Sequence, residues 1–120
     1  GVVSNGVLSA DVTGPDPFLV NTTPLNIAAT NASGLRVRMK NSTAGNRAQF
    51  YWTTTTESNF DEGKSVTFNI VPNDSDYRDY WINLSVLPRW QGTIQQIRLD
   101  PTGAETGRIS IELIELLPKL

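Results

Sequence analysis

Short runs in which apolar and polar residues alternate recur along the chain, whereas no window keeps an apolar period of 3.6 residues. Residues 35–40, LRVRMK, alternate without a break, and 48–54 place Ala, Phe, Trp and Thr on one parity. Alternation with a period of two predicts half-buried β-strands. Strands are expected at 8–12, 35–40, 48–54, 66–70, 80–86, 94–99 and 107–117, with short candidates at 18–20 and 25–27.

The segments between these runs are rich in Gly, Asn, Asp and Pro, which favour turns. The segment 41–46, NSTAGN, is expected to form the loop of a hairpin. In 107–117 the apolar positions change parity, which predicts a β-bulge near Glu112 or Leu113. About eight strands without intervening helices indicate an all-β fold, an antiparallel two-sheet β-sandwich that residues 1–120 form as a single domain.

Composition limits the chemistry that the chain can perform and leaves the predicted fold unchanged. With 38% hydrophobic residues among 120, the chain can bury a core. It has no Cys and no His, which removes thiol nucleophiles, disulfides and the commonest general base and metal ligand. A net charge of −2 gives no electrostatic case for nucleic acid, and no apolar stretch approaches the roughly 18 residues of a membrane span. Nucleic-acid and membrane partners are therefore not expected.

Five Asn-x-Ser/Thr sequons begin at Asn21, Asn31, Asn41, Asn73 and Asn83. Such sequons are N-glycosylation acceptors in a eukaryotic secretory route. They also arise by chance in a sequence rich in Asn, Ser and Thr, and the composition favours this second interpretation.

Three segments carry recognisable motifs. Residues 6–19, GVLSADVTGPDPFL, place a strand before a Gly-x-Asp-Pro-aromatic turn, and 35–55 place a basic alternating strand and an Asn/Ser loop before an aromatic strand. Residues 80–116 contain Trp-x-Gly-x-Ile, Ile-Arg-Leu-Asp-Pro and Gly-x-Ile-x-Ile in that order. Together they resemble the galactose-binding-like jelly rolls that serve as carbohydrate-binding modules in secreted bacterial polysaccharide-degrading enzymes.

The resemblance implies a jelly-roll β-sandwich that binds a polysaccharide or oligosaccharide and is not itself an enzyme. It further implies a secreted, extracellular monomer that holds a catalytic module of the same parent chain near its substrate. Members of the group usually begin with a further aromatic-bearing strand, which would lie upstream of Gly1.

A structural calcium is the one cofactor that the resemblance implies, because in related modules this ion ties the first and last strands together. Asp16 and Glu112 would be its ligands here, with Asp11 as an additional oxygen donor. The group usually has Asp at the position of Glu112.

Sugar rings present an apolar C–H face that stacks on aromatic rings, and planar polar side chains pair with their hydroxyls. Aromatic residues on the polar parity of a strand are therefore the informative ones. Tyr51 has the parity opposite to Phe50 and Trp52, so it should face solvent. In a jelly-roll strand order its surface would also contain Gln49, Thr53, Thr67, Asn69, Gln96 and Arg98. The alternative is a Tyr that covers a sheet edge among solvated neighbours.

Trp81 and Arg38 form a second candidate ligand-binding pair. Trp81 lies on the exposed parity of its strand, and its sheet should also hold Arg36, Arg38 and Lys40. Trp81 could instead pack against a loop or an upstream segment. The basic set could bind an acidic polysaccharide, but a solvated strand face that discourages edge pairing is favoured.

The remaining Trp and acidic residues receive structural interpretations. Trp52 and Trp90 are expected in the core. The loop acids are Glu57, Asp61 and Glu62 in one segment and Asp74, Asp76 and Asp79 in another. A glycosidase needs two carboxylates about 5 to 10 Å apart across a cleft. Solvated loop acids are favoured over such a pair, so no catalytic residue is assigned.

The sequence thus predicts a non-catalytic carbohydrate-binding module that recognises its ligand by aromatic stacking and hydrogen bonding. The alternative from another class is a structural or adhesive accessory β-sandwich of a secreted or surface protein without a glycan ligand. Solvent exposure of Tyr51 or Trp81 in a groove distinguishes the two. If both rings are buried, the structural interpretation is favoured, since buried rings cannot stack on a sugar.

Overall fold

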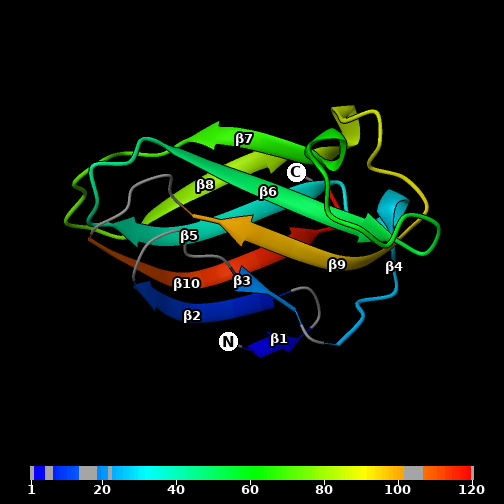
Figure 1. Cartoon of the computed structure of the whole chain (residues 1–120), viewed down its shortest axis with the longest axis horizontal. Coiled ribbons are helices and arrows are strands. Elements are labelled where there is room, and N and C mark those ends of the chain that lie inside the picture. The colour runs from blue at the N-terminus through cyan, green and yellow to red at the C-terminus, as the bar shows by residue number, and fades with distance from the viewer. Residues whose placement is uncertain (1, 5–6, 14–18, 22, 102–106, 120) are drawn as a thin grey trace.

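The computed structural model describes residues 2–4, 7–13, 19–21, 23–101 and 107–119, and it consists of two antiparallel β-sheets packed face to face (Figure 1). Sheet A has the strand order β1 (Val2–Ser4), β2 (Val7–Thr13), β10 (Arg108–Leu117), β5 (Gly34–Asn41) and β8 (Arg78–Asn83). Sheet B has the order β3 (Leu19–Val20), β9 (Thr93–Asp100), β6 (Arg47–Thr54) and β7 (Ser65–Asn69), and β4 (Ile27–Ala28) pairs with β9.

Three short 3-10 helices complete the described structure, η1 (Ala29–Asn31), η2 (Glu62–Lys64) and η3 (Leu84–Val86). No α-helix occurs among the described residues, and none of their helices is long and apolar enough to cross a membrane. The predicted all-β, two-sheet antiparallel sandwich is confirmed. β1 was not predicted, because three residues are too few to show alternation.

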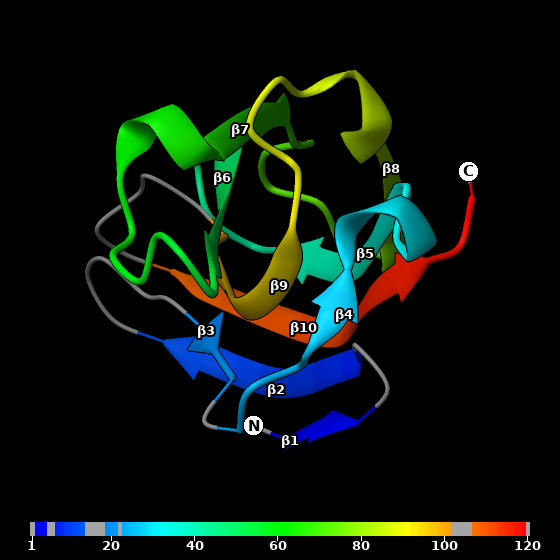
Figure 2. The same cartoon turned by 90° about the vertical axis from the view of Figure 1, so that its right-hand side faces the viewer.

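The hydrophobic core lies between the two layers (Figure 2). In β5, β6 and β10 most of the apolar positions are buried, so the Leu, Val and Met side chains of β5 and Phe50 of β6 belong to one core. Trp52 and Trp90 are core residues as predicted, with 1% and 7% of their surface exposed, and their rings meet edge to face with centroids 5.2 Å apart. The indole N–H groups donate to backbone carbonyls, so burying these rings leaves no polar atom unpaired.

The segment 41–46 does not form a hairpin loop, contrary to the prediction. β5 pairs with β10 and β8, whereas β6 pairs with β7 and β9, so this segment carries the chain from sheet A to sheet B. Each of these strands has an apolar face, and placing them in opposite layers buries both faces. Buried Asn41 holds the corner, because its amide N–H donates to the carbonyls of Gly45 and Val71 at 2.8 and 3.0 Å. Its oxygen accepts from the Thr43 backbone N–H.

The predicted bulge in β10 is confirmed, since the register against β5 shifts between Ile111 and Leu113. A second shift occurs in the pairing of β6 with residues 94–96 of β9. It explains why Ile94 and Ile97 are both buried although they have opposite parity.

The predicted strand 80–86 ends early, because β8 stops at Asn83 and the chain turns into η3. The Asn83 side-chain oxygen accepts from the Ser85 backbone N–H at 3.1 Å and caps this helix. Val86 is consequently 70% exposed rather than part of a strand face.

Asn21, like Asn41, is a sequon residue with a structural role, and each is only 1% exposed. The Asn21 side chain joins the segment after β3 to β9. Its oxygen accepts from the Ile97 N–H at 2.7 Å, and its amide donates to the Gln95 carbonyl at 3.0 Å. At these two positions the acceptor amide is used inside the fold, which agrees with a chance origin of both sequons.

Candidate functional site

The outer face of each sheet carries the candidate ligand-binding residues. Face B is defined as the outer face of sheet B with Gln49, Tyr51, Thr53, Ser65, Thr67, Asn69, Gln96, Arg98 and Asp100. Face A is defined as the outer face of sheet A with Arg36, Arg38, Lys40, Tyr77, Asp79, Trp81, Glu112 and Glu115. The predicted groups around Tyr51 and around Trp81 are thus each brought together, on opposite sides of the sandwich.

Strand pairing produces face B in the predicted order. Tyr51 of β6 is opposite Arg98 of β9 and Ser65 of β7, and Thr53 is opposite Gln96. Asn69 lies at the far end of β7, opposite Arg47 rather than next to Tyr51. Asn69 is therefore the member of the predicted group farthest along the sheet from the Tyr ring.

Tyr51 does not present a free ring, although it has the predicted parity. The Arg98 guanidinium carbon lies 5.3 Å from the Tyr51 ring centroid, and Phe60 meets the ring edge-on at 6.4 Å. The Tyr51 hydroxyl donates to the Glu62 carboxylate at 3.1 Å. Burial away from water, together with this hydrogen bond, raises the pKa of Tyr51 to about 12. The ring is half-buried rather than facing solvent as predicted, because the loop before β7 folds over it.

Neighbouring polar groups on face B are also engaged. Arg98 donates to both carboxylate oxygens of Asp100, at 2.8 and 3.2 Å, and this bond holds the pKa of Arg98 above its usual range. Gln49 donates to Glu62 at 2.6 Å. Thr53 is 1% exposed, and its hydroxyl accepts from the backbone N–H of Gln96. Most of the predicted face-B ligands therefore already have intramolecular partners.

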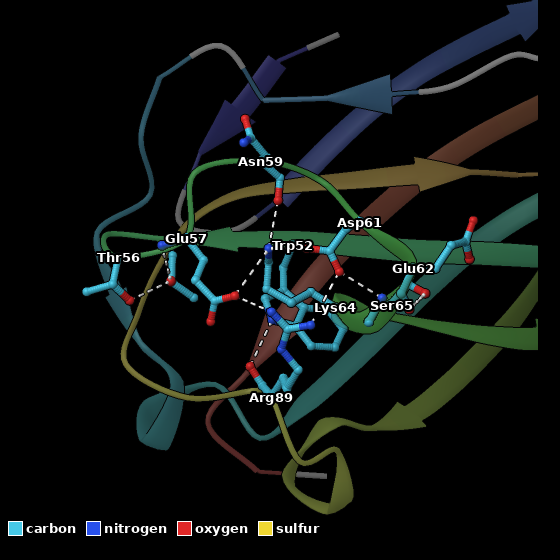
Figure 3. Close-up of polar contacts among 11 residues, drawn as sticks. Trp52, Thr56, Glu57, Asn59, Asp61, Glu62, Lys64, Ser65 and Arg89 are labelled. Carbon is cyan, nitrogen blue, oxygen red and sulfur yellow. Dashed lines mark hydrogen bonds and ion pairs between the residues drawn. The ribbon is translucent and has the colours of Figure 1, made fainter.

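The loop over face B, residues 55–64, is held from inside by Lys64 (Figure 3). The Lys64 side chain is 1% exposed, and its ammonium donates to the Asn59 carbonyl at 2.7 Å and to the Asp61 carboxylate at 2.9 Å. The hydrogen bond from Lys64 lowers the pKa of Asp61. Glu57 and Asp61 both pair with Arg89, which ties the loop to the segment before β9.

Sequence reasoning missed Lys64, although its position gave a signal. Lys64 shares parity with Val66 and Phe68 of β7, so its side chain enters the sandwich side of the strand. Of the acids in this loop, Glu57 and Asp61 serve as ion-pair partners rather than being merely solvated. Their carboxylates neutralise Lys64 and Arg89, which is a structural use.

Face A carries the most exposed Trp or Tyr ring among the described residues. Trp81 is 56% exposed and lies opposite Arg36 in the pairing of β8 with β5. The Arg36 guanidinium carbon is 5.4 Å from the Trp81 ring centroid. Tyr77, just before β8, is 37% exposed, and Lys40 lies 5.3 Å from its ring centroid. The predicted exposure of Trp81 beside the basic strand is confirmed.

The arginines of face A are fixed by a ladder of carboxylates. Asp79 accepts from Arg36 at 3.0 Å and from Arg38 at 3.1 Å. Glu115 lies 3.9 Å from Arg36, and Glu112 lies 3.5 Å from Arg38. Face A therefore places an exposed Trp ring beside arginines whose positions are held by carboxylates.

The calcium prediction stays a prediction. Asp16 and the side chain of Asp11 lie outside the described part of the structure. Glu112 is directed at Arg38, so its carboxylate is occupied by a cation of the protein itself. Within the described residues, no group of three or more acidic side chains could hold a metal ion.

No protein-family model and no curated protein sequence matches the chain. Solved structures do match. One is a family 43 glycoside hydrolase, an arabinoxylan arabinofuranohydrolase from Bacillus subtilis in complex with cellotetraose, at TM-score 0.61 and 14% identity. The match covers 89% of this chain but only 20% of that one, so the chain spans about one fifth of its length.

Two further matches are isolated modules of nearly the same size. A family 6 carbohydrate-binding module from Clostridium cellulolyticum, in complex with xylose, has TM-score 0.54 and 12% identity over 93% of this chain and 87% of that one. A family 11 module from Clostridium thermocellum, in complex with a β-1,3-1,4-mixed-linked tetrasaccharide, has TM-score 0.55 and 14% identity over 98% and 86%. At these identities the likeness shows a shared fold, and the predicted resemblance to jelly-roll carbohydrate-binding modules is confirmed at that level.

Proposed function

We propose that this domain is a non-catalytic carbohydrate-binding module whose glycan stacks on Trp81 of face A. The exposure of Trp81 carries the proposal, because a large aromatic ring 56% open to solvent on an ordered strand has no role in the core. Arg36 covers part of one ring surface, and the remaining surface is available to the C–H face of a sugar.

Polar side chains beside the ring provide hydrogen bonds of the kind that sugars need. Arg36 and Arg38 are held in place by Asp79, so little side-chain entropy is lost when they donate to hydroxyls. Asn83, the residue of β8 after Ile82, is exposed on the same parity as Trp81. Several modest contacts of this type give weak binding that tethering to a neighbouring module strengthens.

The wider setting follows from the same proposal. Structural neighbours in complex with xylose and with a mixed-linked tetrasaccharide support a carbohydrate ligand. A neighbour in which the matching part is one fifth of a glycoside hydrolase chain supports a place beside a catalytic module. The domain would act outside the cell, as a monomer, and target that module to a polysaccharide.

Affinity electrophoresis on a panel of soluble polysaccharides tests the proposal. Trp81→Ala should abolish retardation by whichever polysaccharide retards the wild type, while the fold stays intact by circular dichroism. Val86→Ala is the matched control, because Val86 is an exposed apolar residue that follows the same strand, and it should migrate as wild type. Equal retardation of wild type and Trp81→Ala would remove face A as the binding surface. Retardation lost only in face-B variants would move the site to Tyr51.

A further inference from the structure

The charges of face A are balanced around one carboxylate. Three cations, Arg36, Arg38 and Lys40, share this face with three carboxylates, Asp79, Glu112 and Glu115. Asp79 lies opposite Arg38 and accepts one hydrogen bond from each arginine, at 3.0 and 3.1 Å. The side chains of Arg36, Arg38 and Asp79 are each about one third exposed, so this group lies at the surface that a ligand would touch.

Two further carboxylates, Glu112 and Glu115 of β10, approach the same arginines. Glu115 approaches Arg36 and Glu112 approaches Arg38 from β10, on the side away from Asp79. Each guanidinium is therefore bracketed by two carboxylates. Within the described residues, Lys40 is the one cation of face A without a carboxylate partner at ion-pair distance, and it lies over the Tyr77 ring instead.

A polyanion bound here would have to compete with these carboxylates. Recognition of a uronate or sulfate depends on guanidinium donors that are free to form paired hydrogen bonds. The like charge of Asp79, between the two arginines, would also repel the ligand. An uncharged sugar hydroxyl is not repelled by Asp79 and does not have to displace a carboxylate, because it can accept a hydrogen bond from an arginine that keeps its carboxylate partner.

We propose that Asp79 is a specificity-determining residue that keeps Arg36 and Arg38 engaged, so that face A selects uncharged polysaccharides and rejects uronate-containing ones. This inference rests on the proposed function, since it concerns the ligand class of the same surface. It assigns the basic strand, which by its sequence alone could serve an acidic ligand, to the support of a neutral one.

The test uses Asp79→Asn, with Asp76→Asn as the charge-matched control. Asp76 is an exposed acid in the loop before β8, so both variants raise the net charge equally. Only Asp79→Asn removes the carboxylate that Arg36 and Arg38 share. A second variant, Glu112→Gln with Glu115→Gln, loosens the arginines from the other side and does not depend on Asp79.

The probes are arabinoxylan and mixed-linkage β-glucan as neutral polymers and polygalacturonate as the anionic one, at about 20 mM and about 0.5 M NaCl. The wild type should bind a neutral polymer equally at both salt concentrations and should not bind polygalacturonate. Asp79→Asn should bind polygalacturonate at least tenfold more tightly than Asp76→Asn at low salt and lose this gain at high salt. The double Gln variant should show a smaller gain.

Polygalacturonate binding by the wild type as tight as its neutral binding would overturn the inference while keeping the proposed function. Equal behaviour of Asp79→Asn and Asp76→Asn would also overturn it. No binding of the wild type to any polymer would overturn the proposed function. In that case a gain in Asp79→Asn alone would still support the role of Asp79 in restraining the arginines.

Discussion

Face A and face B carry similar residues, an aromatic ring beside arginines and carboxylates, but they arrange them differently. On face B, Tyr51 is enclosed by Arg98 and Phe60 and donates to Glu62. On face A, Trp81 is 56% exposed. The difference arises from the loop 55–64, which folds back over β6, whereas no loop among the described residues encloses Trp81. Polar parity on a strand thus places a ring outside the core, and a neighbouring loop decides whether the ring stays accessible.

Removal of the buried Lys64 side chain, which holds the loop 55–64 in place, should have the largest effect on stability. Lys64→Ala deletes a side chain that is 1% exposed and removes the ammonium that donates to the Asn59 carbonyl and to Asp61. We expect a loss of about 3 kcal/mol in the free energy of unfolding, measured by urea denaturation. Lys64→Met, which keeps most of the packing volume, should lose less. A Lys64→Ala variant as stable as wild type would show that the loop does not depend on this contact.

Truncation of the two aromatic rings should separate stability from binding. Tyr51→Ala removes the partner of Arg98 and Phe60 and should cost about 2 kcal/mol of stability. Trp81→Ala should change stability by less than about 1 kcal/mol, since its ring is largely exposed. Glycan retention should instead fall more in Trp81→Ala than in Tyr51→Ala. Equal stability losses in the two variants would contradict the contrast between the faces.

The Tyr51 hydroxyl should produce an alkaline stability loss that belongs to face B. Its pKa of about 12 in the folded domain exceeds the usual 10.0, so the folded state keeps a proton that the unfolded chain releases. The resulting stability is fully present below pH 10 and is lost as the pH rises toward 12. Thermal unfolding of wild type and Tyr51→Phe between these values should converge with increasing pH. Parallel curves would show that Tyr51 titrates normally.

The smallest effect is expected at Glu112. Its contact with Arg38 is 3.5 Å long, and 55% of its side chain is exposed, so Glu112→Gln should change stability by no more than about 0.5 kcal/mol. Because Glu112 is directed at Arg38, any shift in melting temperature caused by calcium or its chelation should be the same in this variant as in wild type. A calcium response that disappears in Glu112→Gln would restore this residue to a metal site.

Much of the fold could be predicted because alternation is a local property. The parity of 35–40 correctly separated core from surface, and that of 48–54 correctly placed Ala48, Phe50 and Trp52 in the core but missed the burial of Thr53. The parity change in 107–117 located a real bulge. The hairpin at 41–46 was wrong, because local pattern does not reveal which strand becomes the neighbour. The parity of Lys64 contained a signal, but a buried ammonium is rare enough that parity alone does not single it out.

The sequence by itself determined which face of β5 is buried and most of the buried positions of β6 and β10, since burial follows from side chains spaced two residues apart. It also determined that Trp81 and the basic residues of β5 share a parity suited to solvent. Only the tertiary structure decided that Asp79 stands between Arg36 and Arg38, and that Arg98 and Phe60 enclose Tyr51. These contacts join residues far apart in the chain, and they form only when strand order and loop path bring them together.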